Sequence, residues 1–214
     1  MPNRRLFIHP RRDDVMNGRR RPEAFMYICC TEDLSFLVRT PEGVAVAVYT
    51  DGACLDNGEP WARAGLGVYF GPSSPFNLSG SLSGSQTNQR AEIHAAIRAL
   101  EKIEELYYEA SLPTKSVMIV TDSAYVVGSM TEWIHTWRAN GWRTAGGRTI
   151  ANLSDFLELE EIVQKLERFQ ITVRFWRVPR EFNSQADELA KDAARRSPRE
   201  SPVVVETLGL YLAE

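Results

Sequence analysis

Short runs of apolar and β-branched residues mark five candidate strands along the chain. Each run has strand length and is bounded by turn residues or polar breaks, as expected of strands buried in a sheet. The five runs are 44–49, 63–70, 78–82, 117–120 and 171–176. Short connections join the first three runs, which favours an antiparallel meander over helical crossovers.

Apolar residues recur at helical spacing in two long segments, 91–109 and 153–169. The triplet Thr121-Asp122-Ser123 is an N-cap signature for a short helix, and 187–194 has the pattern of a C-terminal helix. The order of these elements predicts an α/β fold with a mixed five-stranded sheet flanked by helices. Three strands form the antiparallel meander, and two are parallel.

Length and charge divide the chain unevenly. Its 214 residues suit one domain with extensions. The net charge is −3, but residues 1–22 hold seven arginines and two aspartates, so +5 lies there and −8 in the remainder. We expect an arginine-rich flexible arm over 1–23, an unassigned extension over 24–43, the folded domain over 44–197 and a tail over 198–214.

Cysteine usage and hydropathy restrict the compartment. The three cysteines have neither zinc-site nor disulfide spacing, which fits a reducing environment. No uncharged apolar run approaches the roughly 20 residues that span a bilayer, and no signal peptide is evident. We therefore expect an intracellular protein without membrane contact. The nucleus or cytoplasm is favoured, and the arginine-rich start leaves a mitochondrial location open.

Four acidic residues stand at element ends. Asp51 and Asp122 follow strands in similar contexts, Glu92 is expected in the first turn of the long helix, and Asp187 is expected to open the last helix. Each has an ordinary structural reading as a turn residue, an N-cap or a first-turn acid. Gathered without Lys or His partners, however, they would repel one another and favour magnesium, which suits two-metal phosphodiester cleavage.

Six stretches of the chain together resemble the type 1 ribonuclease H family, and eukaryotic members in particular. The most specific is Gln86-Thr87-Asn88-Gln89-Arg90-Ala91-Glu92, and the match extends over about 44–196 in the family's order. The other matching stretches are 49–54, 63–68, 121–123, 133–142 and 186–190. The combination of these stretches outweighs the four separate structural readings of the acids. The resemblance implies a ribonuclease H-like fold for the predicted sheet and helices.

The resemblance implies a catalytic tetrad of Asp51, Glu92, Asp122 and Asp187 that holds two Mg²⁺ ions, with Mn²⁺ as a substitute. The implied reaction is hydrolysis of the RNA strand of an RNA–DNA hybrid, giving a 5′-phosphate and a 3′-hydroxyl. In such a mechanism Asp51 bridges both metals, and Glu92 lies near the 2′-hydroxyl beside the scissile phosphate.

The resemblance also implies contacts with the hybrid. The implied residues are Asn57, Asn88 and Gln89 at the 2′-hydroxyls, Trp133 and Trp137 along the DNA strand, and Thr87 and Asn152 in a phosphate pocket. Without the resemblance, the asparagines would be read as turn and cap residues and the tryptophans as core. Arg138, Arg143 and Arg148 lie among the tryptophans and suit phosphate contact. Ser85 stands where relatives can carry an arginine, which predicts weaker DNA binding.

Two departures from the family stand out. The loop 177–184 lacks the histidine that many members carry before the last acid, so we expect retained but slower turnover, with Arg180 or Glu181 as candidate substitutes. Residues 1–40 leave no room for the compact hybrid-binding module with which many eukaryotic relatives begin.

Three other functions compete with hydrolysis of RNA–DNA hybrids. The first is a catalytically weak hybrid-binding module, which four mutually repelling acids disfavour. The second is the nuclease domain of a reverse-transcribing element, which the Met1 start and the self-contained tail disfavour. The third is a transposase or integrase, which would not need the 86–92 segment. The expected partner is an RNA–DNA hybrid, with no obligate protein partner and a monomeric state.

Overall fold

A mixed β-sheet forms the centre of the computed structural model, which describes residues 5–6, 26–27, 37–40 and 43–198. The long strand β3 (Gly43–Leu55) pairs antiparallel with β4 (Arg63–Tyr69), and β4 pairs antiparallel with β5 (Leu78–Ser81). On the other side of the sheet, β6 (Ser116–Thr121) pairs parallel with β3 and with β7 (Thr172–Arg177). The predicted meander and parallel pair are therefore confirmed.

Two short strands extend this sheet from the segment that the sequence left unassigned. β2 (Leu37–Thr40) pairs antiparallel with the start of β3, and β1 (Met26–Tyr27) pairs antiparallel with β2. The sheet thus has seven strands, five of them in the predicted domain.

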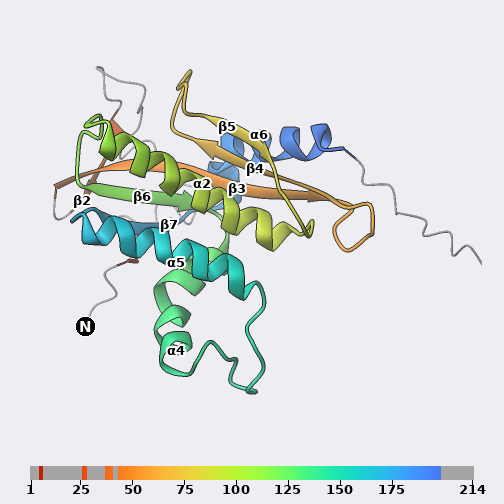
Figure 1. Cartoon of the computed structure of the whole chain (residues 1–214). Coiled ribbons are helices and arrows are strands. Elements are labelled where there is room, and N and C mark those ends of the chain that lie inside the picture. Colours follow the sequence, from red (N-terminus) through yellow and green to blue (C-terminus); the bar gives the residue numbers. More distant parts are fainter. Residues whose placement is uncertain (1–4, 7–25, 28–36, 41–42, 199–214) are drawn as a thin grey trace, which may run out of the picture.

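Helices cover both faces of the sheet (Figure 1). α2 (Asn88–Tyr108) and α5 (Leu153–Arg168) pack on one face, and α6 (Ser184–Arg196) packs on the other. Alternation along β3 supplies both cores, because Val46 and Val48 face α2 while Ala45, Ala47 and Tyr49 face the opposite side. α2 begins three residues earlier than predicted, and α6 also begins three residues earlier.

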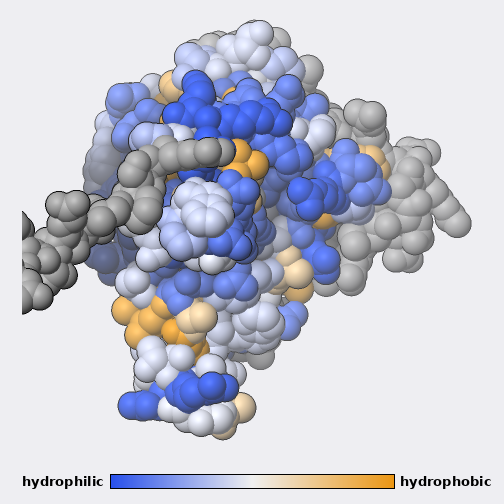
Figure 2. All heavy atoms as spheres, turned by 90° about the vertical axis from the view of Figure 1, so that its right-hand side faces the viewer, coloured by the Kyte–Doolittle hydropathy of each residue, from blue (hydrophilic) through white to orange (hydrophobic). Residues whose placement is uncertain are grey.

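A further helical segment follows β6 and extends away from the sheet (Figure 1). It comprises α3 (Ala124–Gly128), a π-helical turn (Ser129–Trp133) and α4 (Ile134–Ala139). The α4 lobe, defined as residues 129–142, projects from the sheet in Figure 1 and forms the protrusion at the bottom of Figure 2. The side shown in Figure 2 is largely hydrophilic, with an apolar patch where the lobe joins the body.

Glycines let two helices approach the sheet closely. A Cβ at Gly52 would lie 2.1 Å from the backbone nitrogen of Glu92, and one at Gly67 would lie 2.1 Å from the carbonyl oxygen of Ala186. Both distances are far too short for a side chain, so only glycine permits this packing. At Gly65, as at Gly67, the close neighbour is α6.

The predicted terminal segments are only partly described. Arg5 and Leu6, at the start of the predicted arm, lie against β7. The rest of 1–23, and 199–214 of the tail, lie outside the described residues. None of the helices in the described ranges is long and apolar enough to cross a membrane.

Candidate active site

Asp51 lies inside β3 rather than at its end, contrary to the prediction. β3 continues to Leu55 because β4 pairs along one of its edges, where Asp51 is opposite Gly67. Along the other edge of β3, the neighbour β6 stops earlier: Tyr49 pairs with Val120, and β6 ends at Thr121. Continuing this register brings Asp122 beside Asp51. The first two predicted acids therefore meet where β6 stops and β3 runs on.

Glu92 approaches this point from α2. The helix starts at Asn88, so Glu92 lies in its second turn and not in the first, as the sequence had suggested. The contact at Gly52 sets the backbone of Glu92 directly against β3. Its carboxylate accepts hydrogen bonds from Asn88 Nδ2 at 2.9 Å and from Ser123 Oγ at 2.7 Å. Both carboxylate oxygens are thus oriented by neighbours.

Asp122 is held by Asn183, a residue that the sequence analysis gave no role. Asn183 is fully buried, and its Nδ2 donates to Asp122 Oδ1 at 2.9 Å and to the carbonyl oxygen of Thr50 at 3.1 Å. It therefore ties β3 to the end of β6. No sequence signal distinguished Asn183, whereas Ser123 could have been found from its cap position, where it accepts from Val126 N.

Asp187 has cationic partners, which corrects the expectation that the acids stand without them. It lies in the first turn of α6, where its Oδ1 is 3.3 Å from Arg180 Nη2 and its Oδ2 is 2.5 Å from Lys191 Nζ. Arg180 belongs to the loop that lacks the family's histidine, and its side chain is 74% exposed. This loop therefore presents a permanently charged guanidinium beside the last acid.

The four acids lie close enough to perturb one another. Burial raises the pKa of Asp51 to about 8, and repulsion from Asp122 adds to this, while the backbone N–H of Gly52 opposes it. Asp187 and Glu92 raise the pKa of Asp51 further. Burial likewise raises the pKa of Glu92, against the hydrogen bond from Ser123. The centre therefore holds more negative charge than its surroundings neutralise, a situation that a bound cation relieves.

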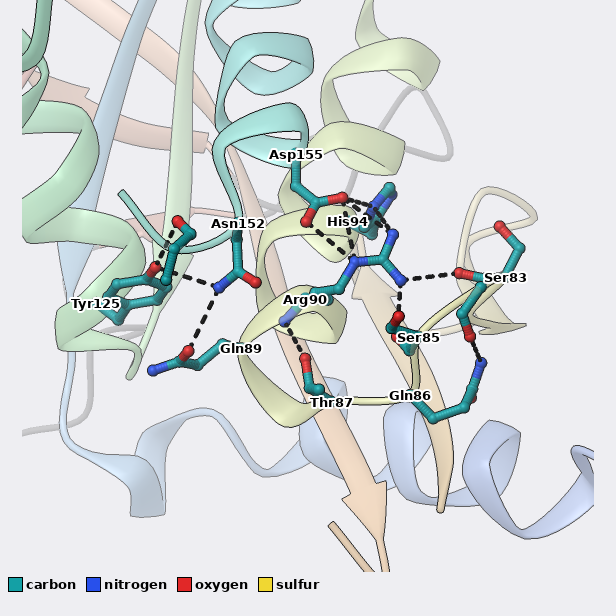
Figure 3. A network of polar contacts seen from close by, with 12 residues as sticks. Ser83, Ser85, Gln86, Thr87, Gln89, Arg90, His94, Tyr125, Asn152 and Asp155 are labelled. Carbon is teal, nitrogen blue, oxygen red and sulfur yellow. Dashed lines mark hydrogen bonds and ion pairs between the residues drawn. The ribbon is translucent and has the colours of Figure 1, made fainter. Parts of the chain in front are cut away.

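The predicted hybrid contacts gather around the start of α2. Asn57, in the β3–β4 loop, accepts from the backbone N–H of Asn88 at 3.1 Å. Asn152 Nδ2 donates to Gln89 Oε1 at 3.3 Å and to the hydroxyl oxygen of Tyr125 at 3.2 Å (Figure 3). Thr87 is the N-cap of α2, its hydroxyl accepting from Arg90 N. The structure thus brings these residues to one side of Glu92.

Arg90 organises the loop in front of these residues. Its guanidinium binds Asp155 of α5 through Nε and Nη2 and donates through Nη1 to the carbonyl oxygens of Ser83 and Ser85 (Figure 3). His94 Nε2 also contacts Asp155 Oδ1, at 2.8 Å, so this histidine faces α5. Burial would raise the pKa of Asp155, but the bonds from Arg90 and His94 outweigh it and hold the pKa low.

The two predicted channel tryptophans differ in exposure. Trp133 is 43% exposed, with its ring 5.9 Å from that of Trp137. Trp137 is half-buried, and its ring lies 5.4 Å from Phe156 of α5. Arg138 and Arg143, which the sequence suggested for phosphate contact, also have partners within the protein: Arg138 forms an ion pair with Glu160, and Arg143 donates to Gly147 O.

Comparisons with known proteins agree with these observations. The RNase H family model matches residues 43–195. The chain is 39% identical to Ribonuclease H1 of Rattus norvegicus and 38% identical to that of Homo sapiens, each over 72% of this chain and 52% of the relative. The chain therefore spans about half the length of these curated relatives. It also matches Ribonuclease H of Thermosynechococcus vestitus at 34% identity, over 76% of this chain and 94% of the relative.

Solved structures agree as well. LC9-RNase H1, described as a type 1 RNase H with the type 2 active-site motif, is 29% identical with a TM-score of 0.53, over 72% of this chain and 74% of that one. The foamy viral protease-reverse transcriptase in complex with RNA/DNA hybrid is 25% identical with a TM-score of 0.56, over 69% of this chain and 20% of that one. The sequence, the fold and the arrangement of the acids lead to one conclusion: the chain belongs to the RNase H family, as a type 1 member resembling those of eukaryotes.

Proposed function

We propose that this chain is a metal-dependent endoribonuclease that hydrolyses the RNA strand of RNA–DNA hybrids. The observation that carries the proposal is the convergence of Asp51, Glu92, Asp122 and Asp187, from four separate elements, in a member of the RNase H family. The negative charges of Asp122, Asp187 and Glu92 add to burial in raising the pKa of Asp51, and carboxylate oxygens are the donors that Mg²⁺ prefers.

The four carboxylates would hold two Mg²⁺ ions, with Mn²⁺ as a substitute. When bound, the metals supply an activated water and stabilise the leaving 3′ oxygen, so that the products carry a 5′-phosphate and a 3′-hydroxyl. Within the described ranges, no three His, Cys, Asp or Glu side chains already form a metal-binding group. Metal binding would therefore exchange some of the present contacts of these acids, including the bond from Asn183 and the pairs with Arg180 and Lys191.

Neighbouring side chains position the acids. Ser123 and Asn88 orient the two oxygens of Glu92, and Asn183 fixes Asp122 against β3. Such partners of metal ligands commonly set affinity and rate because they hold a ligand's orientation. The buried amide of Asn183 makes two of these bonds, one to Asp122 after β6 and one to the carbonyl oxygen of Thr50 in β3.

Recognition of the hybrid would use the residues at the start of α2. Asn57, Asn88 and Gln89 offer amide groups for the 2′-hydroxyls of the RNA strand, which is how a protein distinguishes RNA from DNA. Thr87 and Asn152 would bind a phosphate of the DNA strand. Trp133 offers an exposed ring for stacking, and the ring of Trp137 lies 5.9 Å from it.

Arg180 would serve where other family members carry a histidine. A guanidinium remains charged at all relevant pH values, so it cannot exchange a proton as a histidine does. It can neutralise a phosphate beside Asp187, but general acid–base help, worth about 10²- to 10⁴-fold in rate, is absent. Slower turnover than in histidine-containing relatives is the expected consequence.

We also propose that the protein acts as a monomer without an obligate protein partner, and inside the cell, in the nucleus or cytoplasm. The support for this location is the absence of disulfide-like cysteine spacing in the sequence.

The test is a cleavage assay on labelled RNA–DNA hybrid, duplex DNA and duplex RNA, with Mg²⁺ or with a chelator. We expect cleavage of the RNA strand of the hybrid alone, and only with metal. Asp51→Asn and Asp122→Asn should each lower the rate at least about a hundredfold, because a metal ligand contributes several kcal/mol to the transition state.

Asp192→Asn is the matched control, since Asp192 is an exposed acid on α6 whose carboxylate pairs with Arg195. It should cleave like the unmodified protein. Tight hybrid binding without cleavage in Mg²⁺ or Mn²⁺ would contradict the proposal and favour a hybrid-binding module.

A further inference from the structure

Residues 5 and 6 form an additional edge on the sheet. The backbone N–H of Phe175 donates to the carbonyl oxygen of Arg5 at 2.7 Å, and Leu6 pairs with Phe175 in parallel orientation. Leu6 also packs against the main hydrophobic core. A segment that precedes the start of α4 by 128 residues in sequence is thereby fixed beside β7, on the α5 side of the sheet.

The side chain of Arg5 continues this attachment onto α5. Its Nε and Nη2 bind the two carboxylate oxygens of Glu167 at 3.0 and 2.9 Å, and its Nη1 binds Glu160 Oε2 at 2.6 Å. Only 7% of the Arg5 side chain and 5% of the Glu160 side chain are exposed. An arginine that bridges two carboxylates in this way is a directional contact, because the planar guanidinium fixes the position of both partners.

Glu160 connects this cluster to the α4 lobe. Its second oxygen, Oε1, forms the ion pair with Arg138 of α4 and accepts from Gln164 of α5. Glu160 thus forms ion pairs with two arginines, Arg5 of the N-terminal segment and Arg138 of the lobe. The two cations of the cluster balance its two carboxylates, so the loss of either arginine would leave a buried charge uncompensated.

The lobe depends on contacts of this kind. α4 has only six residues, and a stretch of exposed residues follows it. The helix is attached to the body through the buried Ile134, the contact between Trp137 and Phe156, and the pair between Arg138 and Glu160. Arg138 follows Trp137 directly, so the position of Glu160 helps to set where the tryptophans stand.

We infer that Arg5 is a positioning residue for hybrid binding: through Glu160 and Arg138 it fixes the orientation of the tryptophan-bearing α4 lobe. This inference rests on the proposed function for its effect on substrate. It gives one arginine of the basic N-terminal segment a role other than direct contact with nucleic acid.

The experiment compares Arg5→Met, Arg138→Met and the double variant in full-length protein. Arg5→Met should raise the KM for hybrid about fivefold and leave kcat within about twofold, because ground-state binding is affected and the carboxylates are not. Arg138→Met should have a similar effect, and the double variant should be no worse than the stronger single variant, since both break one network. Arg5→Lys should restore part of the affinity, because an ammonium can bind one of the two carboxylates.

Arg98→Met is the control, because Arg98 forms an exposed pair with Glu101 on α2. It should leave KM unchanged. Hydrogen exchange measured at 134–139 gives a readout independent of catalysis: exchange should be faster in Arg5→Met than in the unmodified protein or in Arg98→Met.

The outcomes separate the two proposals. An unmodified protein that does not cleave hybrid contradicts the proposed function, while faster exchange in Arg5→Met would still support the positioning of the lobe. Unchanged exchange at 134–139, or a lowered melting temperature with unchanged KM in a cleaving protein, would overturn the role of Arg5 and reduce it to fold stabilisation.

Discussion

The carboxylate centre is built on the sheet itself, whereas the α4 lobe extends from the short helix that follows β6. In the centre, α2 and α6 contact the strands through glycines at van der Waals limits, and Asn183 bonds β3 to Asp122. In the lobe, residues 129–131 are buried, but α4 itself is attached through the buried Ile134, the ring contact of Trp137 with Phe156 and the ion pair of Arg138 with Glu160. The close packing in the carboxylate centre holds the acids in one arrangement, whereas the fewer contacts of α4 permit that helix to change its orientation.

This difference assigns different kinetic roles to the two regions. Groups that meet the reacting phosphate must be held within a fraction of an ångström, and changes there should lower kcat. Groups that bind the DNA strand at a distance contribute to affinity, and changes there should raise KM. The following predictions test that separation, from the largest expected effect to the smallest.

Gly52→Ala should nearly abolish cleavage, by about a hundredfold or more, and lower the melting temperature, because its Cβ would meet the backbone of Glu92 at 2.1 Å. Hybrid cleavage and thermal unfolding measure this. Gly146→Ala, in the loop after the lobe, is the matched control, since its Cβ would have only Thr144 Oγ1 within 4 Å, at 3.9 Å. Equal effects of the two substitutions would remove the distinction between the regions.

Asn183→Ala should lower kcat about ten- to hundredfold with little change in KM, because Asp122 loses its orienting donor. Steady-state kinetics at several Mg²⁺ concentrations measure this, and excess metal should recover part of the rate. An effect on KM alone would show that Asn183 belongs to substrate binding rather than to the metal centre.

Trp133→Ala should raise KM about five- to tenfold and leave both kcat and the melting temperature near their original values. The reason is that Trp133 is 43% exposed, so its ring is available for stacking. Trp137→Ala provides the comparison. Its ring packs on Phe156, so this change should also lower the melting temperature. If Trp133→Ala lowers kcat and not affinity, the lobe takes part in the chemical step and the assignment above is wrong.

Ser85→Arg should lower the Kd for hybrid about two- to threefold and steepen its salt dependence by about one phosphate contact. The side chain of Ser85 is exposed, and the loop is held through its backbone carbonyl by Arg90, so the substitution leaves that contact intact. Binding at two or more salt concentrations measures the effect. An unchanged slope would mean that position 85 does not reach the backbone of the nucleic acid.

Hydrophobic periodicity and family motifs predicted five of the sheet's strands, the long helices and the gathering of the four acids, but not β1 and β2. They failed where tertiary contacts decide. Asp51 was expected at a strand end because a turn-like Asp-Gly follows the apolar run, but pairing with β4 extends β3 past it. Asp187 was expected to lack cationic partners, yet the fold places Arg180 and Lys191 against it.

Other features depend on residues far apart in the sequence. Asn183 gains its role from the approach of α6 to β3, and Arg5 from the proximity of the N-terminal segment to α5. Arg138 matched the expected phosphate-binding pattern, but a buried glutamate on another helix engages it. No local pattern encodes such partners.

The ends of the cleaved RNA test the central claim most directly. A hybrid labelled on both strands is incubated with the protein and Mg²⁺, and the termini of the fragments are identified. The account predicts RNA fragments with 5′-phosphate and 3′-hydroxyl ends, an intact DNA strand, and no cleavage after chelation. Fragments ending in a 2′,3′-cyclic phosphate, formed with or without metal, would contradict it, because they require attack by the 2′-hydroxyl rather than by a water held at the four carboxylates.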